Sequence, residues 1–181
     1  MNFKKYFLLL TFSLLVAVSQ VFAGDFYWVG NSGNWNDASH WSNTPGGKGG
    51  FGVPTSNDNV FFDDNSFSQA KAEVKIGSSI SINNLNISSQ KHFAISSTKN
   101  SDINILGSAQ IFSEFDNQIK SSIHFKSNKN ETIHLGWFVW QTDIYFEGTG
   151  TYKLTSPIQN HANSLNHISG TLDLNGFDLL C

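Results

Sequence analysis

The sequence predicts an all-β protein, built as a parallel β-helix (β-solenoid) of about five coils with a Trp-rich N-terminal cap. Short runs of alternating apolar and polar residues, broken by Asn, Gly and Ser, fill residues 24–181. No stretch there has the 3.6-residue period of an amphipathic helix. A strand template also recurs about every 20 residues, which is typical of one solenoid coil stacked on the next.

The recurring template is a small polar residue, an apolar residue, a polar or aromatic residue, and a second apolar residue. Its first apolar residue falls at positions 80, 103, 123 and 144, and a fifth copy at 171–174 follows after a longer interval. Coils stacked about 4.8 Å apart would align these side chains in one inward column, consisting of Ile80, Ile103, Ile123 and Ile144. The residues that follow them would point outward: Ser81, Asn104, His124 and Tyr145.

Two pairs of polar residues predict sharp turns. Asn83-Asn84 and Asn175-Gly176 each separate two alternating halves, and both residue types tolerate tight backbone conformations. Each pair can form a corner between two faces of a solenoid coil, or a two-residue hairpin in a β-sandwich. The regular spacing of the template favours the corner.

Residues 1–23 have the layout of a cleavable secretory signal. Lys4 and Lys5 precede an apolar run from position 6 to 18, and a short segment ends at Ala23. The run of about 13 residues is shorter than the roughly 20 residues that a membrane-spanning helix requires. We therefore expect cleavage after Ala23 and an extracellular or outer cell-surface location, without a membrane span in the processed protein.

The composition of the remaining chain disfavours nucleic acid as a partner. It holds 9 lysines against 14 acidic residues and no arginine, whereas a phosphate backbone requires a basic surface. Cys181 is the only cysteine, so no disulfide can form within the chain. An exported chain of this kind depends on its core and on ladder hydrogen bonds.

A Trp- and Gly-rich segment, residues 24–71, precedes the solenoid coils of residues 72–181. Trp28, Trp35 and Trp41 lie close together in it. Such side chains bury a large apolar area, so we expect them to cover the first coil as a cap. The alternative is an aromatic platform on which sugars stack.

This segment also resembles a known group of proteins. The motifs are 27–30 (Tyr-Trp-Val-Gly), 33–35 (Gly-Asn-Trp), Trp41-Ser42, Pro54-Thr55, and 60–63 (Val-Phe-Phe-Asp), with Ser66-Phe67 after them. This pattern is similar to the opening of large secreted surface proteins of Gram-negative bacteria, which are cargo of type IX secretion. The later repeats resemble the β-helices of autotransporter and adhesin passenger domains. The resemblance implies a surface or adhesin-like role.

The C-terminal residues predict that the solenoid continues. Leu179, Leu180 and Cys181 are apolar and no polar cap follows them, although an uncovered last coil exposes a sheet edge. No C-terminal sorting tail is present, in contrast to the resembling proteins. We expect either a longer protein with further coils or a partner that covers this edge.

The sequence identifies no catalytic, cofactor-binding or metal-ligating residue. Asp58, Asp63 and Asp64 lie close together and could bind calcium, but turn capping accounts for such residues equally well. Asp102 and Asp143 occupy equivalent positions two coils apart, about 10 Å if stacked, near the separation used by inverting glycosidases. The six histidines lack zinc-like spacing, although His124 and His134 could lie on neighbouring strands.

The densest aromatic cluster of the repeat region spans residues 137–140. Alternation places Trp137 and Val139 on one side and Phe138 and Trp140 on the other. One pair could therefore face outward as a contact site. The alternative is a bulky loop folded onto the shaft.

These observations favour a non-enzymatic, adhesin-like β-solenoid segment of a larger secreted protein, which binds a glycan or another cell-surface ligand. The alternative is a polysaccharide-active β-helix enzyme or a carbohydrate-binding module. A structural stalk that binds nothing is a third reading.

Overall fold

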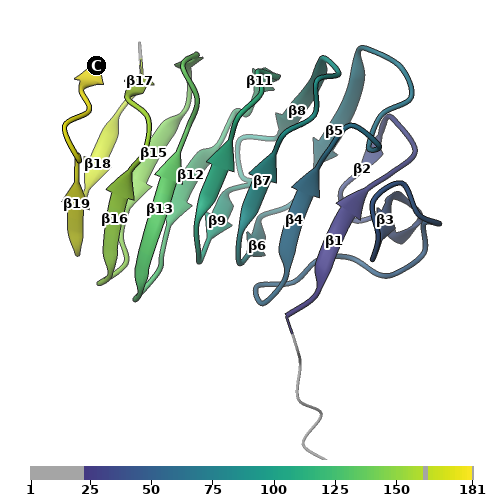
Figure 1. The fold of residues 1–181 in the computed structure, drawn as a ribbon, viewed down its shortest axis with the longest axis horizontal. Helices are drawn as coiled ribbons and strands as arrows, with labels where there is room; N and C mark the ends of the chain where they lie inside the picture. Colours follow the sequence, from purple (N-terminus) through teal and green to yellow (C-terminus); the bar gives the residue numbers. More distant parts are fainter. Residues whose placement is uncertain (1–22, 161–162, 181) are drawn as a thin grey trace, which may run out of the picture.

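The computed structural model describes residues 23–160 and 163–180; most of the predicted signal (1–22) and Cys181 lie outside this range. The described chain is a parallel β-helix of about six turns, slightly more than the five predicted. The difference arises because the Trp-rich segment contributes strands to two of the sheets. Figure 1 shows the strands stacked along the long axis, from the Trp-rich end to the C-terminal end.

Sheet A forms the longest face. Its strands lie in the order β3 (Trp41–Ser42), β1 (Asp25–Trp28), β4 (Asn59–Phe62), β7 (Leu85–Ile87), β10 (Ala109–Ile111), β13 (Asn130–His134), β16 (Thr151–Leu154) and β19 (Thr171–Asp173). All neighbours are parallel except β3, which pairs antiparallel with β1 at the end of the sheet. A 3₁₀ turn, η1 (Ala38–His40), leads into β3.

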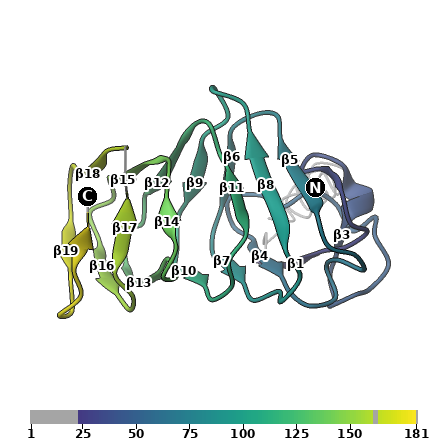
Figure 2. The ribbon, with the colours of Figure 1, turned by 90° about the horizontal axis from the view of Figure 1, so that it is seen from above.

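Three further sheets complete the coils. Sheet B consists of β2 (Gly33–Asn34), β5 (Ala72–Ile76), β8 (Phe93–Ser97) and β11 (Asp116–Gln118). Sheet C consists of β6 (Ile80–Ile82), β9 (Ile103–Ile105), β12 (Ser122–Phe125), β15 (Asp143–Phe146) and β18 (Leu165–His167). Sheet D consists of β14 (Val139–Trp140), β17 (Ile158–Asn160) and β20 (Leu179–Leu180). Figure 2 shows sheet D continuing the face of sheet B along the axis.

The predicted isoleucine column is confirmed in sheet C. Ile80 pairs with Ile103, Ile103 with Ile123, and Ile123 with Ile144, and all four side chains are buried. The residues between them alternate to the outer surface, because successive side chains of a strand point to opposite faces. On that surface the rings of His124 and Tyr145 stack at 4.7 Å.

The fifth copy of the template lies on a different sheet from the other four. Residues 171–173 form β19 in sheet A, and the fifth strand of sheet C is β18, in which Leu165 pairs with Ile144. Position 165 continues the regular spacing of positions 103, 123 and 144, which position 172 does not. The template recurs on another sheet because the alternation of apolar residues is the same on every face of a coil.

Both predicted turns are corners of the solenoid. Asn83-Asn84 connects β6 of sheet C to β7 of sheet A, and Asn175-Gly176 connects β19 to β20. Asn175 and Gly176 have φ values of 48° and 81°, a left-handed region that favours these two residue types. The hairpin alternative is wrong at both positions.

The three tryptophans of the N-terminal segment are buried in one aromatic cluster. The ring of Trp41 lies 5.0 Å from that of Trp28 and 4.8 Å from that of Trp35, both edge-on. Its indole N–H donates to the carbonyl of Trp35 at 2.7 Å. Phe62 connects this cluster to the interior of the coils, 6.2 Å from Trp41. These contacts fill the interior beneath the terminal strand β3.

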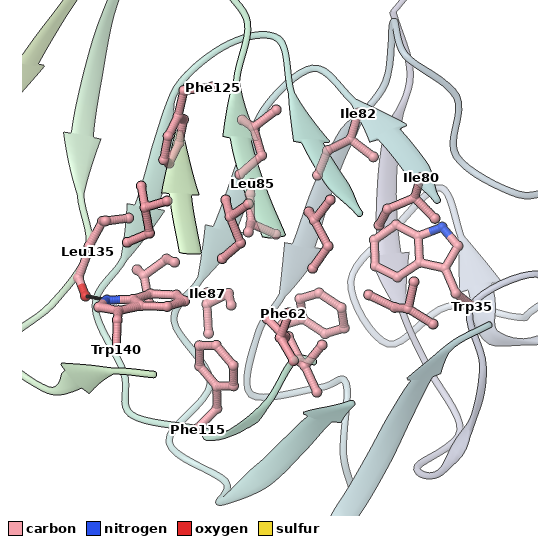
Figure 3. A pocket seen from close by; sticks show the side chains of 18 residues that line it. Trp35, Phe62, Ile80, Ile82, Leu85, Ile87, Phe115, Phe125, Leu135 and Trp140 are labelled. Atoms are coloured by element: carbon pink, nitrogen blue, oxygen red, sulfur yellow. Dashed lines mark hydrogen bonds between the residues drawn. The ribbon is translucent and has the colours of Figure 1, made fainter. Parts of the chain in front are cut away.

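The interior of the coils is a packed apolar core. Figure 3 shows side chains from several coils, including Trp35, Ile82, Phe125 and Trp140, pointing into the same space. The free volume among them is about 20 Å³, which is room for about one water molecule. This part of the interior therefore has no space for a larger ligand, and the search for a binding site turns to the outer surface of the described residues. The described residues contain no helix that is long and apolar enough to cross a membrane.

Candidate functional site

A row of aromatic and amide side chains crosses the outer face of sheet A. Register pairs Tyr27 with Phe61, Phe61 with Asn86, Asn86 with Gln110, and Gln110 with His134. Beside the middle of this row lies a shallow groove of about 320 Å³. We call it the sheet A groove; it is lined by Asn59, Phe61, Asn84, Leu85, Asn86, Ser108, Gln110 and Glu131.

The row begins with two stacked aromatic rings. The rings of Tyr27 and Phe61 lie 4.7 Å apart and only 16° from parallel. Partial burial raises the pKa of the Tyr27 phenol, and the carboxylates of Asp25 and Asp63 raise it further. The phenol is therefore neutral at physiological pH and able to donate a hydrogen bond.

Amide side chains form the middle of the row and also lie beside it, and they differ in how many hydrogen bonds hold them. The Asn59 carbonyl oxygen accepts from the amides of Asn83 (2.9 Å) and Asn84 (2.8 Å), so these groups are fixed by one another. The Gln110 amide donates to the Thr132 hydroxyl at 2.8 Å. The Asn86 amide makes no hydrogen bond within residues 23–160 and 163–180. It is therefore free to donate to and accept from a ligand.

Glu131 is the only carboxylate among the described residues that line the groove. Its two oxygens accept hydrogen bonds from the hydroxyls of Ser108 (2.7 Å) and Ser127 (2.9 Å). These bonds hold the carboxylate in a fixed orientation. Glu131 thus contributes a negative charge to one side of the groove.

The row ends in a second aromatic group at the corner after β13. His134 Nδ1 lies 3.1 Å from the carbonyl oxygen of Thr155, and the Phe112 ring lies 4.7 Å from the imidazole. When Nδ1 carries the proton it donates to this carbonyl, which leaves Nε2 as an acceptor. Phe112 is 60% exposed and Trp137 is 69% exposed. The Phe112 ring that contacts His134 is therefore accessible to solvent at this end of the row.

The alternation predicted for residues 137–140 is confirmed. Trp137 and Val139 are exposed, whereas Trp140 is buried and Phe138 is partly buried against the core. The Trp140 indole N–H donates to the carbonyl of Leu135 at 3.0 Å, as Figure 3 shows. Gly136, with a φ of 73°, allows the turn that leaves Trp137 outside.

Two other hollows border sheet B. One of about 340 Å³ carries mixed charge and is lined by Lys71, Ala72, Glu73, His92, Phe93, Ala94, Asp116 and Gln118. The other, of about 280 Å³, is lined by Ser89, Gln90, His92, Phe112, Ser113 and Glu114. The sheet A groove differs from both because Phe61 in its lining stacks on the neighbouring ring of Tyr27, which makes it the better candidate for a ring-shaped ligand.

The three aspartates considered for calcium each accept a hydrogen bond from a different backbone N–H group. Asp58 accepts from the backbone N–H of Thr55, Asp63 from that of Asn65, and Asp64 from that of Gln90. Within the part of the chain that the structure describes, no group of three or more His, Cys, Asp or Glu side chains is placed to hold a metal ion.

The aspartates considered as a catalytic pair occupy the equivalent positions that the repeat predicts, at the starts of β9 and β15. Asp102 accepts from the backbone N–H of Ser122 at 3.2 Å, and Asp143 from that of Ser164 at 2.8 Å. Each carboxylate thus caps the next coil at the same corner. His124 and His134 lie on different sheets, C and A, and are not neighbours.

No protein-family model, curated protein or solved structure matches the chain.

Sequence reasoning did not identify the row on sheet A. Its members Phe61, Asn86, Gln110 and His134 follow one another at nearly equal intervals along the chain. These equal intervals could have indicated that the four residues lie on the same face of successive coils. It was hidden because the residues at these positions differ in chemistry, whereas the isoleucine column repeats a single residue type.

Proposed function

We propose that this chain is a non-enzymatic, adhesin-like segment of an exported protein, and that it binds glycans along the outer face of sheet A. The observation that carries this proposal is the continuous row from the Tyr27–Phe61 ring pair, through Asn86 and Gln110, to His134.

The chemistry of the row suits a carbohydrate. The C–H faces of a sugar ring pack on aromatic rings, and its hydroxyls exchange hydrogen bonds with amides, which both donate and accept. Successive positions in the row are one coil apart, about 4.8 Å. An extended chain of sugars lying parallel to the solenoid axis would therefore meet a new polar side chain at each coil.

The groove favours binding over hydrolysis. Glycoside hydrolysis commonly uses two carboxyl groups on opposite sides of the scissile bond. Glu131 is the single carboxylate among the described lining residues, and two serine hydroxyls already bind it. Asp102 and Asp143 lie on sheet C, at a corner where they cap backbone N–H groups.

A glycan array probed with residues 24–181 tests the proposal. We expect binding to extended glycans without release of reducing or unsaturated ends. Phe61→Ala should weaken binding by about two- to tenfold, because a stacked aromatic contact contributes roughly 0.5–1.5 kcal/mol beyond its buried area. Asn86→Ala should weaken it less.

Two matched controls lie outside the row. Phe51 is an exposed aromatic residue in the glycine-rich segment 46–52, and Ser81 is an exposed polar residue of sheet C. Phe51→Ala and Ser81→Ala should leave glycan binding unchanged. Equal losses from Phe51→Ala and Phe61→Ala would contradict a specific site on sheet A, and release of sugar ends would favour the enzyme.

The export component of the proposal rests on residues 1–23. Fusing these residues to a reporter enzyme that is active only outside the cytoplasm of a Gram-negative host tests it directly. We expect reporter activity, and we expect the replacement of Leu8, Leu9 and Leu10 by Asp to abolish it, since a charged segment cannot serve as the apolar core of a signal.

We also propose that a further parallel coil packs against β18, β19 and β20. These strands are the last of sheets C, A and D, so one edge of each lacks a neighbour within the described residues. Leu165, Leu172 and Leu179 are only partly buried there. A parallel strand would pair this edge and cover these leucines.

A further inference from the structure

Asp58 is a buried carboxylate that lacks a cationic side chain. Its side chain is 6% exposed. Oδ2 accepts from the backbone N–H (2.8 Å) and the hydroxyl (2.7 Å) of Thr55. Within the described residues, no Lys or His side chain forms an ion pair with it. A buried negative charge without a counter-charge is costly to the folded state.

The remaining oxygen of Asp58 is directed at the backbone nitrogen of Gly24. Gly24 N donates to Asp58 Oδ1 at 2.8 Å across 34 positions of sequence. The carbonyl of Gly24 accepts from the N–H of Asn59 at 2.8 Å. Gly24 is thus held on both sides at the point where β1 begins to pair with β4.

The absence of a β-carbon at residue 24 leaves room for this close contact. A β-carbon on residue 24 would lie 3.1 Å from the ring of Phe26 and 3.2 Å from Asp58 Oδ1, closer than ordinary contact on both sides. The preceding residue, Ala23, is exposed. The peptide bond between them therefore joins an accessible residue to one that is fixed in the fold.

We propose that hydrolysis of the Ala23–Gly24 bond turns this contact into a buried ion pair that locks the first strand of the solenoid. Water adds across the amide: Ala23 leaves with the new carboxylate, and Gly24 keeps the nitrogen, which takes up a proton as an α-ammonium group. The ammonium then donates to Asp58 Oδ1 from the position of the former amide N–H. This inference rests on the proposed export and specifies its processing site.

Processing would therefore strengthen the end of the solenoid. Before processing, the carboxylate is the only charged partner in this hydrogen bond; afterwards both partners are charged, so coulombic attraction is added to it. The new cation also compensates the charge of Asp58. If residue 23 is retained, the ammonium group moves one residue away, to an exposed position, and the Gly24 nitrogen stays a neutral amide.

The first test is the N-terminal residue of the full 181-residue chain after export from a Gram-negative host, determined by intact mass and N-terminal sequencing. Gly24 is the expected first residue. A processed protein that begins elsewhere would overturn the inference and leave export intact. A secreted chain that still contains residues 1–23 would overturn the processing inference and leave export intact, and a chain retained in the cytoplasm with residues 1–23 would count against both.

The second test compares the thermal stability of residues 24–181 with that of residues 23–181. The chain that begins at Gly24 should unfold at a higher temperature by about 3–8 °C, the shift expected for a charged hydrogen bond in a domain of this size. Acetylation of the Gly24 amine should abolish the gain. This comparison keeps Asp58 unchanged, so it does not depend on a variant that could fail to fold.

The third test removes the charge of Asp58. In Asp58→Asn, the difference between the two chain starts should fall to about 1 °C or less. Asp25→Asn is the matched control, because Asp25 is an exposed carboxylate next to Gly24 that accepts from the Asn59 amide at 2.8 Å. It should preserve the difference. Equal stability of the two starts in the unsubstituted protein, or loss of the difference in Asp25→Asn only, would refute the ion pair.

Discussion

Glu147 is the centre of a small charged cluster on the outer face of sheet C. Its carboxylate lies 3.1 Å from His124 Nδ1 and 3.3 Å from Lys126 Nζ. Partial burial tends to raise the pKa of this carboxyl, but the contacts with His124 and Lys126 outweigh burial and lower it. The cluster connects β12 to the end of β15, and so joins two adjacent coils.

The lowered pKa of Glu147 predicts a pH dependence of stability. Since the folded-state pKa lies below the usual 4.5, the ionised carboxylate stabilises the folded state above about pH 4.5. This stabilisation is lost as the pH falls through the lower, folded-state pKa. Urea unfolding between pH 7 and pH 3 should show Glu147→Gln less stable than the parent at pH 7, with a difference that shrinks at low pH. Glu114→Gln, at an exposed position without an ion pair among the described residues, should change the free energy of unfolding at pH 7 by less than about 0.5 kcal/mol.

The close approach of Gly150 to the neighbouring coil predicts that a single added carbon atom would cause a steric clash. A β-carbon at this position would lie 1.9 Å from the backbone carbonyl oxygen of Lys129 in the neighbouring coil. Gly150→Ala should therefore destabilise the protein by about 1–3 kcal/mol or more, because the backbones must separate. Gly77 has no atom within 4 Å of the same point. Gly77→Ala should change the free energy of unfolding by less than about 1 kcal/mol, and equal effects in urea unfolding would contradict this explanation.

At the scale of elements, the coils are joined at the corner before sheet C by a ladder of side-chain caps. Ser79 accepts from the N–H of Asp102, Asp102 from that of Ser122, and Asp143 from that of Ser164. Each cap satisfies a backbone donor at the start of the next strand, as an N-cap does for a helix. The small polar residue that opens the repeated template thus has a structural role.

This ladder predicts a local effect of Asp143→Ala. Loss of the 2.8 Å bond to the N–H of Ser164 should destabilise β18 by about 1 kcal/mol. Hydrogen exchange should show faster exchange at residues 164–167, with little change in β1 and β4. Asp116→Ala is the control, since the Asp116 side chain contacts Gln118 of its own strand. A uniform rise in exchange over the whole chain would contradict a local cap.

At the scale of the whole molecule, stability depends on the contact of each coil with the next one. Ile123 is 5% exposed and packs between Ile103 and Ile144 in the central column. Ile123→Ala should cost about 2–5 kcal/mol, since it leaves a cavity between two coils. In a stacked architecture this cost also weakens the coupling of the two ends, because each repeat contacts only its neighbours.

Urea unfolding followed by two probes can test this coupling. Hydrogen exchange at β1 and β4 reports the N-terminal half of the molecule, and hydrogen exchange at β16 and β17 reports the other half. In the parent both should unfold together, and in Ile123→Ala the transitions should separate. Ile168→Ala, at a position 66% exposed, should change stability by less than about 0.5 kcal/mol. Coincident transitions in Ile123→Ala would indicate that the coils unfold as one unit despite the cavity.

Local sequence patterns were enough to predict the solenoid, the inward column of Ile80, Ile103, Ile123 and Ile144, the corners at 83–84 and 175–176, and the outward position of Trp137. These features depend on alternation within a strand and on turn residues, both of which are local. The sequence also indicated cleavage after Ala23, which stays a prediction.

The pairing of strands between coils became known from the three-dimensional fold alone. Corner segments differ in length, so the step from one coil to the next varies and residues of unlike chemistry align. Phe61, Asn86 and Gln110 form a row for this reason, and Leu165 rather than Leu172 continues the isoleucine column. Gly24 and Asp58 meet in the same way, although they lie far apart in the sequence. Which residues meet between coils depends on the combined lengths of the strands and corners that separate them. The pattern of residues within one strand does not reveal those lengths.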